Sequence, residues 1–197
     1  MKLLIFGDIH QDLEAVKSII GQKADWYICH GDLSDRGQGL ADAAQILAPL
    51  QEKLWLLPGN NETVDQIKSL CQQFGFTNFH QKAIRQGDHV LAGLGYTVPT
   101  PFATPGEIRE EEFVRSLKQF ASQKNLLLFT HDAPKATALD LISSGVHVGN
   151  QAVRDFLDQH QPLYLFSGHI HENAGKSQRL GLTTCFNVGK KGLVFWL

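Results

Sequence analysis

The sequence is poor in cysteine and has no Cys-x-x-Cys pair. Its three cysteines, Cys29, Cys71 and Cys185, are widely spaced and odd in number. This arrangement disfavours a disulfide framework and a thiolate metal site, and it is typical of reduced core residues in a cytoplasmic protein. We therefore expect the protein in the cytoplasm.

An excess of positive charge and a long apolar run are also absent. Lys and Arg number 18 against 20 Asp and Glu, which gives a net charge of −2. This balance does not favour strong non-specific binding to nucleic acid, although it leaves a local basic patch open. Asp8 interrupts the N-terminal apolar run 3–6 too early for a signal peptide, and no stretch approaches membrane-spanning length. We therefore expect no membrane partner.

What the sequence does contain is a series of short apolar runs. Of its 197 residues 43% are hydrophobic, which is enough for the core of one domain, and we predict a single domain over 1–197. Runs 2–7, 24–29 and 53–57 are each followed by a polar turn and then by a helical pattern. Three such βα units in succession predict an α/β fold with a largely parallel sheet.

The rest of the chain is expected to add strands and helices in a less regular order. The pattern predicts a hairpin turn at 86–88, strands at 89–94, 125–129, 163–166, 183–188 and 193–197, and helices at 107–121 and after Asn150. Residues 95–106 contain three prolines and predict an irregular loop at the rim of a site.

Side chains that can bind metals come directly after five of the expected strands. They are Asp8, His10, Asp32, Asn60, His131, His169 and His171. Because ligands gather at the carboxyl ends of the strands in an open α/β sheet, these side chains are expected to converge. A mixture of imidazole and oxygen ligands suits Mn, Fe, Zn or Ni. It is typical neither of a thiolate site nor of an all-oxygen site for Ca or Mg. Seven ligands are too many for one tetrahedral ion, and a bridging carboxylate would let them serve two.

The motifs that contain these residues resemble one known family. In chain order they are Asp8-x-His10, Gly31-Asp32-x-x-Asp35, Gly59-Asn60-x-Glu62, His131 and Gly168-His169-x-His171. This series resembles the calcineurin-like metallophosphoesterase superfamily and spans nearly the whole chain. Segments 99–107, 145–149 and 168–172 are similar to those of small bacterial and archaeal members of its phosphodiesterase-like branch.

The resemblance implies a four-layer sandwich of two mixed β-sheets flanked by helices, with two divalent transition-metal ions at one edge. Manganese is our first choice, with iron, zinc or nickel as alternatives. Carried over to this chain, Asp8, His10 and His171 would bind one ion, Asn60, His131 and His169 would bind the other, and Asp32 would bridge them. A hydroxide held between the ions would attack phosphorus.

Three further residues are candidates for contact with the substrate. Arg36 lies close to Asp32 in sequence and can bind a phosphate oxygen, with a surface ion pair as the alternative. Asn61 stands where much of the superfamily has a histidine, and an amide cannot supply a proton to a leaving group. His147, in a glycine-flanked loop, is therefore a candidate for catalysis or substrate binding. Asp35 and Glu62 are expected to orient loops, and His30 is expected to be structural or on the surface.

The predicted function is hydrolysis of phosphate esters, with phosphodiesters ahead of phosphomonoesters. The expected substrate is a small phosphate ester or a nucleotide; nucleic acid is not favoured. A phosphomonoesterase or protein phosphatase is the alternative enzyme, because segment 31–37 resembles the corresponding segment of protein Ser/Thr phosphatases. A non-catalytic metal-binding scaffold of the same fold stays open because Asn61 replaces the usual histidine. The sequence leaves the oligomeric state open.

Overall fold

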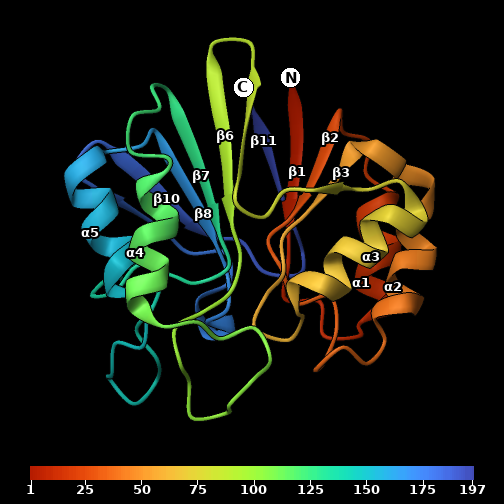
Figure 1. The fold of residues 1–197 in the computed structure, drawn as a ribbon, viewed down its shortest axis with the longest axis horizontal. Coiled ribbons are helices and arrows are strands. Elements are labelled where there is room, and N and C mark those ends of the chain that lie inside the picture. The colour runs from red at the N-terminus through yellow and green to blue at the C-terminus, as the bar shows by residue number, and fades with distance from the viewer.

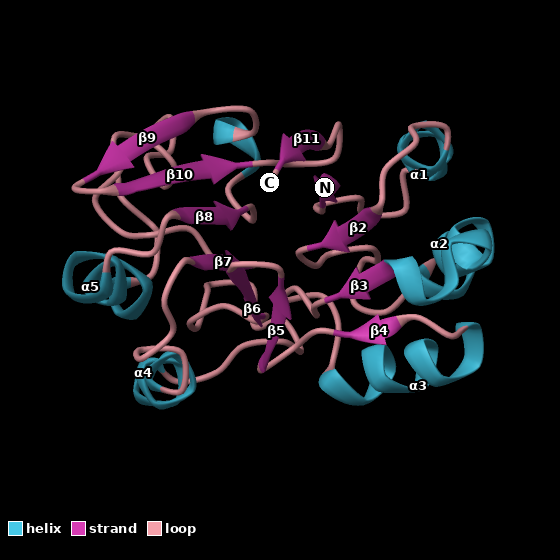
Figure 2. Cartoon of the chain, turned by 90° about the horizontal axis from the view of Figure 1, so that it is seen from above, coloured by secondary structure: helices cyan, strands magenta, loops and turns pink.

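Two β-sheets pack face to face in the middle of the molecule, and helices cover the outer face of each (Figures 1 and 2). The computed structural model describes residues 1–197. This arrangement confirms the expected four-layer sandwich of two mixed sheets. None of the helices combines the length and the apolar character needed to cross a membrane.

The first sheet contains the three predicted βα units. Its strands lie in the order β11-β1-β2-β3-β4, and only β11 runs antiparallel to its neighbour. The strands are β1 (Lys2–Phe6), β2 (Trp26–Cys29), β3 (Leu54–Leu56), β4 (Thr77–Asn78) and β11 (Leu193–Trp196). The helices on its outer face are α1 (Leu13–Ile20), α2 (Leu40–Leu47) and α3 (Val64–Phe74), with a short 3₁₀ segment η1 (Ala48–Lys53) after α2.

The second sheet has its strands in the order β5-β6-β7-β8-β10-β9. They are β5 (Lys82–Gln86), β6 (His89–Leu94), β7 (Leu126–Thr130), β8 (Tyr164–Ser167), β9 (Ser177–Leu180) and β10 (Thr183–Asn187). The central four strands are parallel, and β5 and β9 close the two edges as antiparallel strands. Helices α4 (Glu110–Lys118) and α5 (Gln151–His160) cover its outer face, and a 3₁₀ turn η2 (His171–Asn173) comes after β8.

The central strands are continuous apolar runs because both of their faces are buried. In β1, Leu3 and Ile5 belong to the cluster between the two sheets, whereas Leu4 and Phe6 pack toward α1 and α2. The second sheet has its own outer cluster with α4 and α5. The sandwich therefore holds three apolar layers, and polar groups are displaced to the ends of the strands.

Several local predictions can be compared directly with this fold. The helix predicted after Asn150 is α5, which the Asn150 side chain caps, and the hairpin between β5 and β6 turns at 87–88. Helix α4 is shorter than the predicted 107–121. The two strands at the end of the chain exist, but β10 joins the second sheet and β11 the first. Strand β9 was not predicted, because its sequence Ser-Gln-Arg-Leu contains no apolar run.

Candidate metal centre

The seven predicted ligands lie together at the carboxyl ends of the strands. Asp8 and His10 come after β1, Asp32 after β2 and Asn60 after β3. The second sheet contributes His131 after β7, and His169 and His171 after β8. Short contacts between their side chains connect all seven, so the convergence expected from the strand order is found.

Four of these seven residues have a strained backbone. The φ angles of Asp8, His10, Asp32 and His169 are 54°, 47°, 55° and 66°, in the left-handed region that residues with a Cβ enter at a cost. Such conformations persist where the surrounding structure enforces them, and they cluster at functional sites. The four strained residues lie in the loops directly after β1, β2 and β8.

The first group of candidate ligands is Asp8, His10 and His171. Their ligand atoms lie within 4.8 Å of one another. Nε2 of His10 is 3.0 Å from Nε2 of His171, and the latter nitrogen is 3.9 Å from Oδ1 of Asp8. This is the set that the resemblance assigns to one ion.

The second group lies around His131. Ligand atoms of Asp32, His131 and His169 lie within 4.8 Å of one another. Oδ1 of Asn60 is 3.0 Å from Nε2 of His131. Burial lowers the pKa of His169 to about 4, so its ring is neutral and can present a lone pair. This group matches the set assigned to the other ion.

Asp32 lies between the two groups. Its Oδ2 is 3.4 Å from Nε2 of His10 and 3.4 Å from Nε2 of His131. Burial would raise the pKa of Asp32, but the neighbouring His131 and His10 outweigh it and lower the pKa. An ionised carboxylate equally close to both groups has the position that a bridging ligand needs.

The hydrogen bonds of His131 show that this donor set fits a cation. Nδ1 of His131 is 3.1 Å from the carbonyl oxygen of His30, which can only accept, so Nδ1 donates. In a neutral ring the Nε2 lone pair would then face Oδ1 of Asn60 and Oδ2 of Asp32, which are also acceptors. Burial alone would lower the pKa of His131, but the charge and hydrogen bond of Asp32, together with the charges of Asp8 and Glu62, raise the pKa to about 9. Three acceptor atoms directed at one point call for positive charge, from a proton or a metal ion.

Two carboxylates orient the ligands and their loops, as expected. Oδ1 of Asp35 is 2.7 Å from Nδ1 of His10, which leaves Nε2 of His10 for a metal. The buried Glu62 accepts hydrogen bonds from the backbone N–H groups of Asp32, Ser34 and Gly59 and from the Ser34 hydroxyl. Glu62 therefore joins the loops after β2 and β3 that carry two of the ligands.

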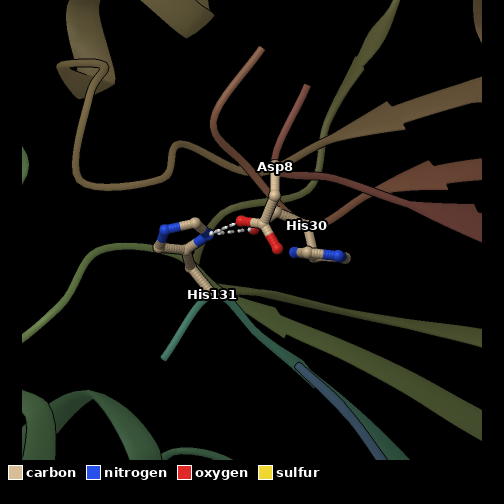
Figure 3. A group of neighbouring side chains, drawn as sticks. All are labelled: Asp8, His30 and His131. Atoms are coloured by element: carbon tan, nitrogen blue, oxygen red, sulfur yellow. Dashed lines mark hydrogen bonds and ion pairs between the residues drawn. The ribbon is translucent and has the colours of Figure 1, made fainter. Parts of the chain in front are cut away.

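His30 was expected to be structural or on the surface, and it is fully buried beside the candidate ligands, which excludes the surface position. Figure 3 shows its ring beside the Asp8 carboxylate, with His131 on the other side of that carboxylate. Neither ring nitrogen has a hydrogen-bond partner, and burial lowers its pKa to about 4. The ring is therefore a neutral neighbour of the ligands. The sequence indicated this only through its place directly before Gly31-Asp32 at the end of a strand.

The three candidates for substrate contact differ in how closely they approach the ligands. The guanidinium of Arg36 donates to the carbonyl oxygens of Phe102 and Ala103, so it forms no ion pair. Nδ2 of Asn61 donates to Oδ2 of Asp32 over 2.7 Å. Nδ1 of His147 is 2.7 Å from Oδ1 of the buried Asp140. No hydrogen bond joins His147 to the seven candidate ligands. Asn61 thus contacts a candidate ligand directly, whereas the side chains of Arg36 and His147 are bound to residues outside the seven.

A cavity of about 370 Å³ opens beside the first group of ligands. Asp8, His10 and His171 line it together with Lys190, whose ammonium is 2.7 Å from Oδ2 of Asp12. The sequence placed Lys190 only in a loop between two strands. Its distance in sequence from every motif explains why no pattern indicated it.

Comparison with known proteins assigns the chain to a family. The family model for calcineurin-like phosphoesterases matches residues 1–173, so the chain belongs to the calcineurin-like phosphoesterase family. An uncharacterized protein of Methanocaldococcus jannaschii is 29% identical over 180 residues, which are 88% of this chain and 81% of that protein. The family consists of hydrolases of phosphoric esters that use divalent metal ions, and the chain is assigned to that class.

Solved structures show the same fold at low sequence identity. The phosphopantetheinyl hydrolase of Mycobacterium tuberculosis superposes with a TM-score of 0.69 at 14% identity, over 95% of this chain and 88% of that one. A dimetal phosphatase from Danio rerio has a TM-score of 0.61 at 12% identity, over 96% and 88% of the two chains. At such identities these two structures support the fold alone.

Proposed function

We propose that this chain hydrolyses phosphate esters with a centre of two divalent transition-metal ions, and that it prefers phosphodiesters to phosphomonoesters. The observation that carries the dinuclear proposal is the position of Asp32, whose Oδ2 lies 3.4 Å from a ligand nitrogen of each group. Imidazole and oxygen ligands suit manganese, iron, zinc and nickel. We take manganese as the first candidate and the other three as alternatives.

In this proposal the ligands divide as the two groups do. Asp8, His10 and His171 would hold one cation, and Asn60, His131 and His169 would hold the other, with Asp32 shared. Two cations so bound supply a nucleophilic hydroxide at neutral pH and charge that stabilises the attacking and leaving oxygens of an in-line displacement.

The chain's own residues orient this chemistry. Asp35 fixes the ring of His10 through Nδ1, and the backbone carbonyl of His30 does the same for His131. Asn61 holds the Asp32 carboxylate and has no proton to give to a leaving group. Arg36 is proposed as a phosphate ligand, for which it would exchange its bonds to the carbonyls of Phe102 and Ala103.

His147 is proposed as the residue that protonates or binds the leaving group. Asp140 engages Nδ1 of His147, so Nε2 is the nitrogen left to face a substrate. One contact supports this proposal: the backbone N–H of Ser143, four residues before His147, donates to Glu172, the residue after His171. If His147 binds the leaving group without protonating it, no side chain supplies the proton that Asn61 lacks, and esters with acidic leaving groups, such as phenols, should react best.

We infer a small phosphate ester or a nucleotide as the substrate. Lys190 beside the cavity adds a positive charge that suits a phosphate. The segment 31–37 supports the phosphomonoesterase or protein phosphatase as the second candidate. A non-catalytic scaffold is the third, and a search for turnover decides it.

The test compares an aryl phosphodiester with the matching aryl phosphomonoester. Metal-stripped protein is assayed before and after addition of Mn²⁺, with Asp32→Asn as the control. We expect Mn²⁺ to restore turnover of the diester in the wild type and not in the variant. Preference for the monoester would favour the phosphatase. Binding of two ions without turnover of either ester would favour the scaffold.

A further inference from the structure

The loop after β6 is fastened along the loop that carries Asn60. We call residues 96–107 the strap. In Figure 1 the strap is the loop between β6 and α4, which extends below the ends of the strands. The backbone N–H of Tyr96 donates to the carbonyl of Pro58 over 3.1 Å, and that of Gly106 donates to the carbonyl of Asn60 over 2.8 Å. A Cβ at Gly106 would collide with the carbonyl oxygen of Gly59, so the close approach requires glycine there.

A side-chain relay continues this attachment. Nδ2 of Asn60 donates to the hydroxyl of Thr104 over 2.9 Å. That hydroxyl donates to Oε1 of Glu107 over 2.7 Å. The hydroxyl of Thr100 and the backbone N–H of Thr104 donate to the same oxygen. These bonds outweigh the effect of burial and lower the pKa of Glu107, so it is a carboxylate at neutral pH.

Glu107, the last residue of the relay, determines the direction of each hydrogen bond in it. A carboxylate only accepts, so the single proton of the Thr104 hydroxyl is directed to Glu107. Toward Asn60 the hydroxyl can then only accept. The two ends of an amide have nearly the same shape, so hydrogen-bond partners decide which end points where. Nδ2 of Asn60 therefore faces Thr104, and Oδ1 faces His131, from whose Nε2 it is 3.0 Å distant.

We propose that Thr104 and Glu107 are positioning residues that present the amide oxygen of Asn60 to the metal ion also held by His131 and His169. The proposal rests on the dinuclear centre proposed above and assigns part of the strap to it. An amide binds a metal through its oxygen, because its nitrogen has no free lone pair. Partners of this kind typically change metal affinity by about 10–100-fold when they are lost.

The experiment titrates the metal-stripped protein with Mn²⁺ in a calorimeter. In Thr104→Val a methyl replaces the hydroxyl, and we expect one of two binding steps to weaken about 10-fold or more while the other is unchanged. Asn60→Ala should weaken the same step. Thr104→Ser keeps the hydroxyl and should restore wild-type binding.

Thr100→Val is the matched control, since Thr100 also donates to Glu107 but does not contact Asn60. It should leave both steps unchanged, and the melting temperatures of all variants verify that they are folded. Two wild-type binding steps in folded Thr104→Val would overturn the relay and leave the dinuclear centre standing. If the wild type itself binds fewer than two ions, the dinuclear centre fails, and the relay with it.

Discussion

His30 shows how glycine at two strand ends makes room for a buried ring. A Cβ at Gly7 or at Gly168 would collide with the His30 imidazole, and at Gly168 it would lie 2.5 Å from Oδ2 of Asp8. Neither glycine has a positive φ, so the constraint at both is steric. The glycine before His169 thus lets the loop after β8 approach the loop after β1.

The first prediction tests this packing. Gly168→Ala should lower the free energy of unfolding by about 1–3 kcal/mol, because the added methyl overpacks a filled space. In the double variant with His30→Ala the collision with the imidazole is removed and only the one with Oδ2 of Asp8 remains, so the loss should be smaller than the sum of the two single losses. Chemical denaturation measures all three variants. Gly21→Ala is the control, since a Cβ there meets only ordinary contacts at 3.5 Å. Additive losses would contradict the contact.

At the scale of elements, apolar periodicity predicted the central strands and the polar residues at their ends. The runs that became β1, β2, β3, β7 and β8 are each largely buried, and the polar residues after them supply all the candidate ligands. Neither strand β9 nor the two-residue β4 was predicted as an individual strand, because a strand at the edge of a sheet can pair without an apolar run. The strap was expected as a loop, but its contacts with Asn60 depend on residues 44 apart and have no local signal. The sequence left the burial of His30 open for the same reason, because the ring packs against residues far away in the sequence, such as Gly168.

The tip of the strap gives the second prediction. Arg36 holds the carbonyls of Phe102 and Ala103, and the Phe102 side chain is 70% exposed. Arg36→Met removes both bonds, so the tip should open more often. Limited digestion with chymotrypsin, which cleaves after aromatic residues, should then cut after Phe102 several-fold faster. Arg109→Met removes an arginine that makes no such bonds and should digest like the wild type. Equal rates in Arg36→Met would show that other contacts hold the tip.

His80, at the junction of β4 and β5, gives a third prediction. Its Nδ1 accepts a hydrogen bond from the backbone N–H of Gly95, and burial lowers its pKa from 6.5 to about 4. Between these values the unfolded chain binds a proton that the folded chain does not, so stability falls as the pH falls. From pH 6.5 to pH 4.5 the wild type should lose about 2 kcal/mol more than His80→Asn, which accepts the bond without titrating. Urea unfolding at both pH values measures this. Parallel pH profiles would exclude His80 as the source.

At the scale of the whole molecule, the centre joins the two sheets. Asp8, Asp32 and Asn60 come from the first sheet, whereas His131 and His169 come from the second. Their side chains lie close together at the carboxyl ends of the strands, although the two sheets are separated by the inner apolar cluster. Cations bound there would therefore link both halves of the fold, and metal binding and folding should be coupled.

The last prediction concerns this coupling. At Mn²⁺ concentrations of about 100 times the dissociation constant, each occupied site should add about 2.7 kcal/mol to the free energy of unfolding. In a chain of this size, one site corresponds to a rise in melting temperature of roughly 5–10 °C. Asp32→Asn should lose most of the rise, because it weakens both sites. Asp42→Asn, which alters an exposed carboxylate on α2, should keep it.

The rise should also depend on pH in a definite direction. In the metal-stripped protein burial lowers the pKa of His131, but Asp32, Asp8 and Glu62 together raise it to about 9. A cation must therefore displace its proton, so the rise at a fixed Mn²⁺ concentration should be larger at pH 8 than at pH 6. Scanning calorimetry at the two pH values tests this. A rise that is independent of pH would show that His131 does not compete for the ion, and a rise retained in Asp32→Asn would remove the bridging role on which the dinuclear centre depends.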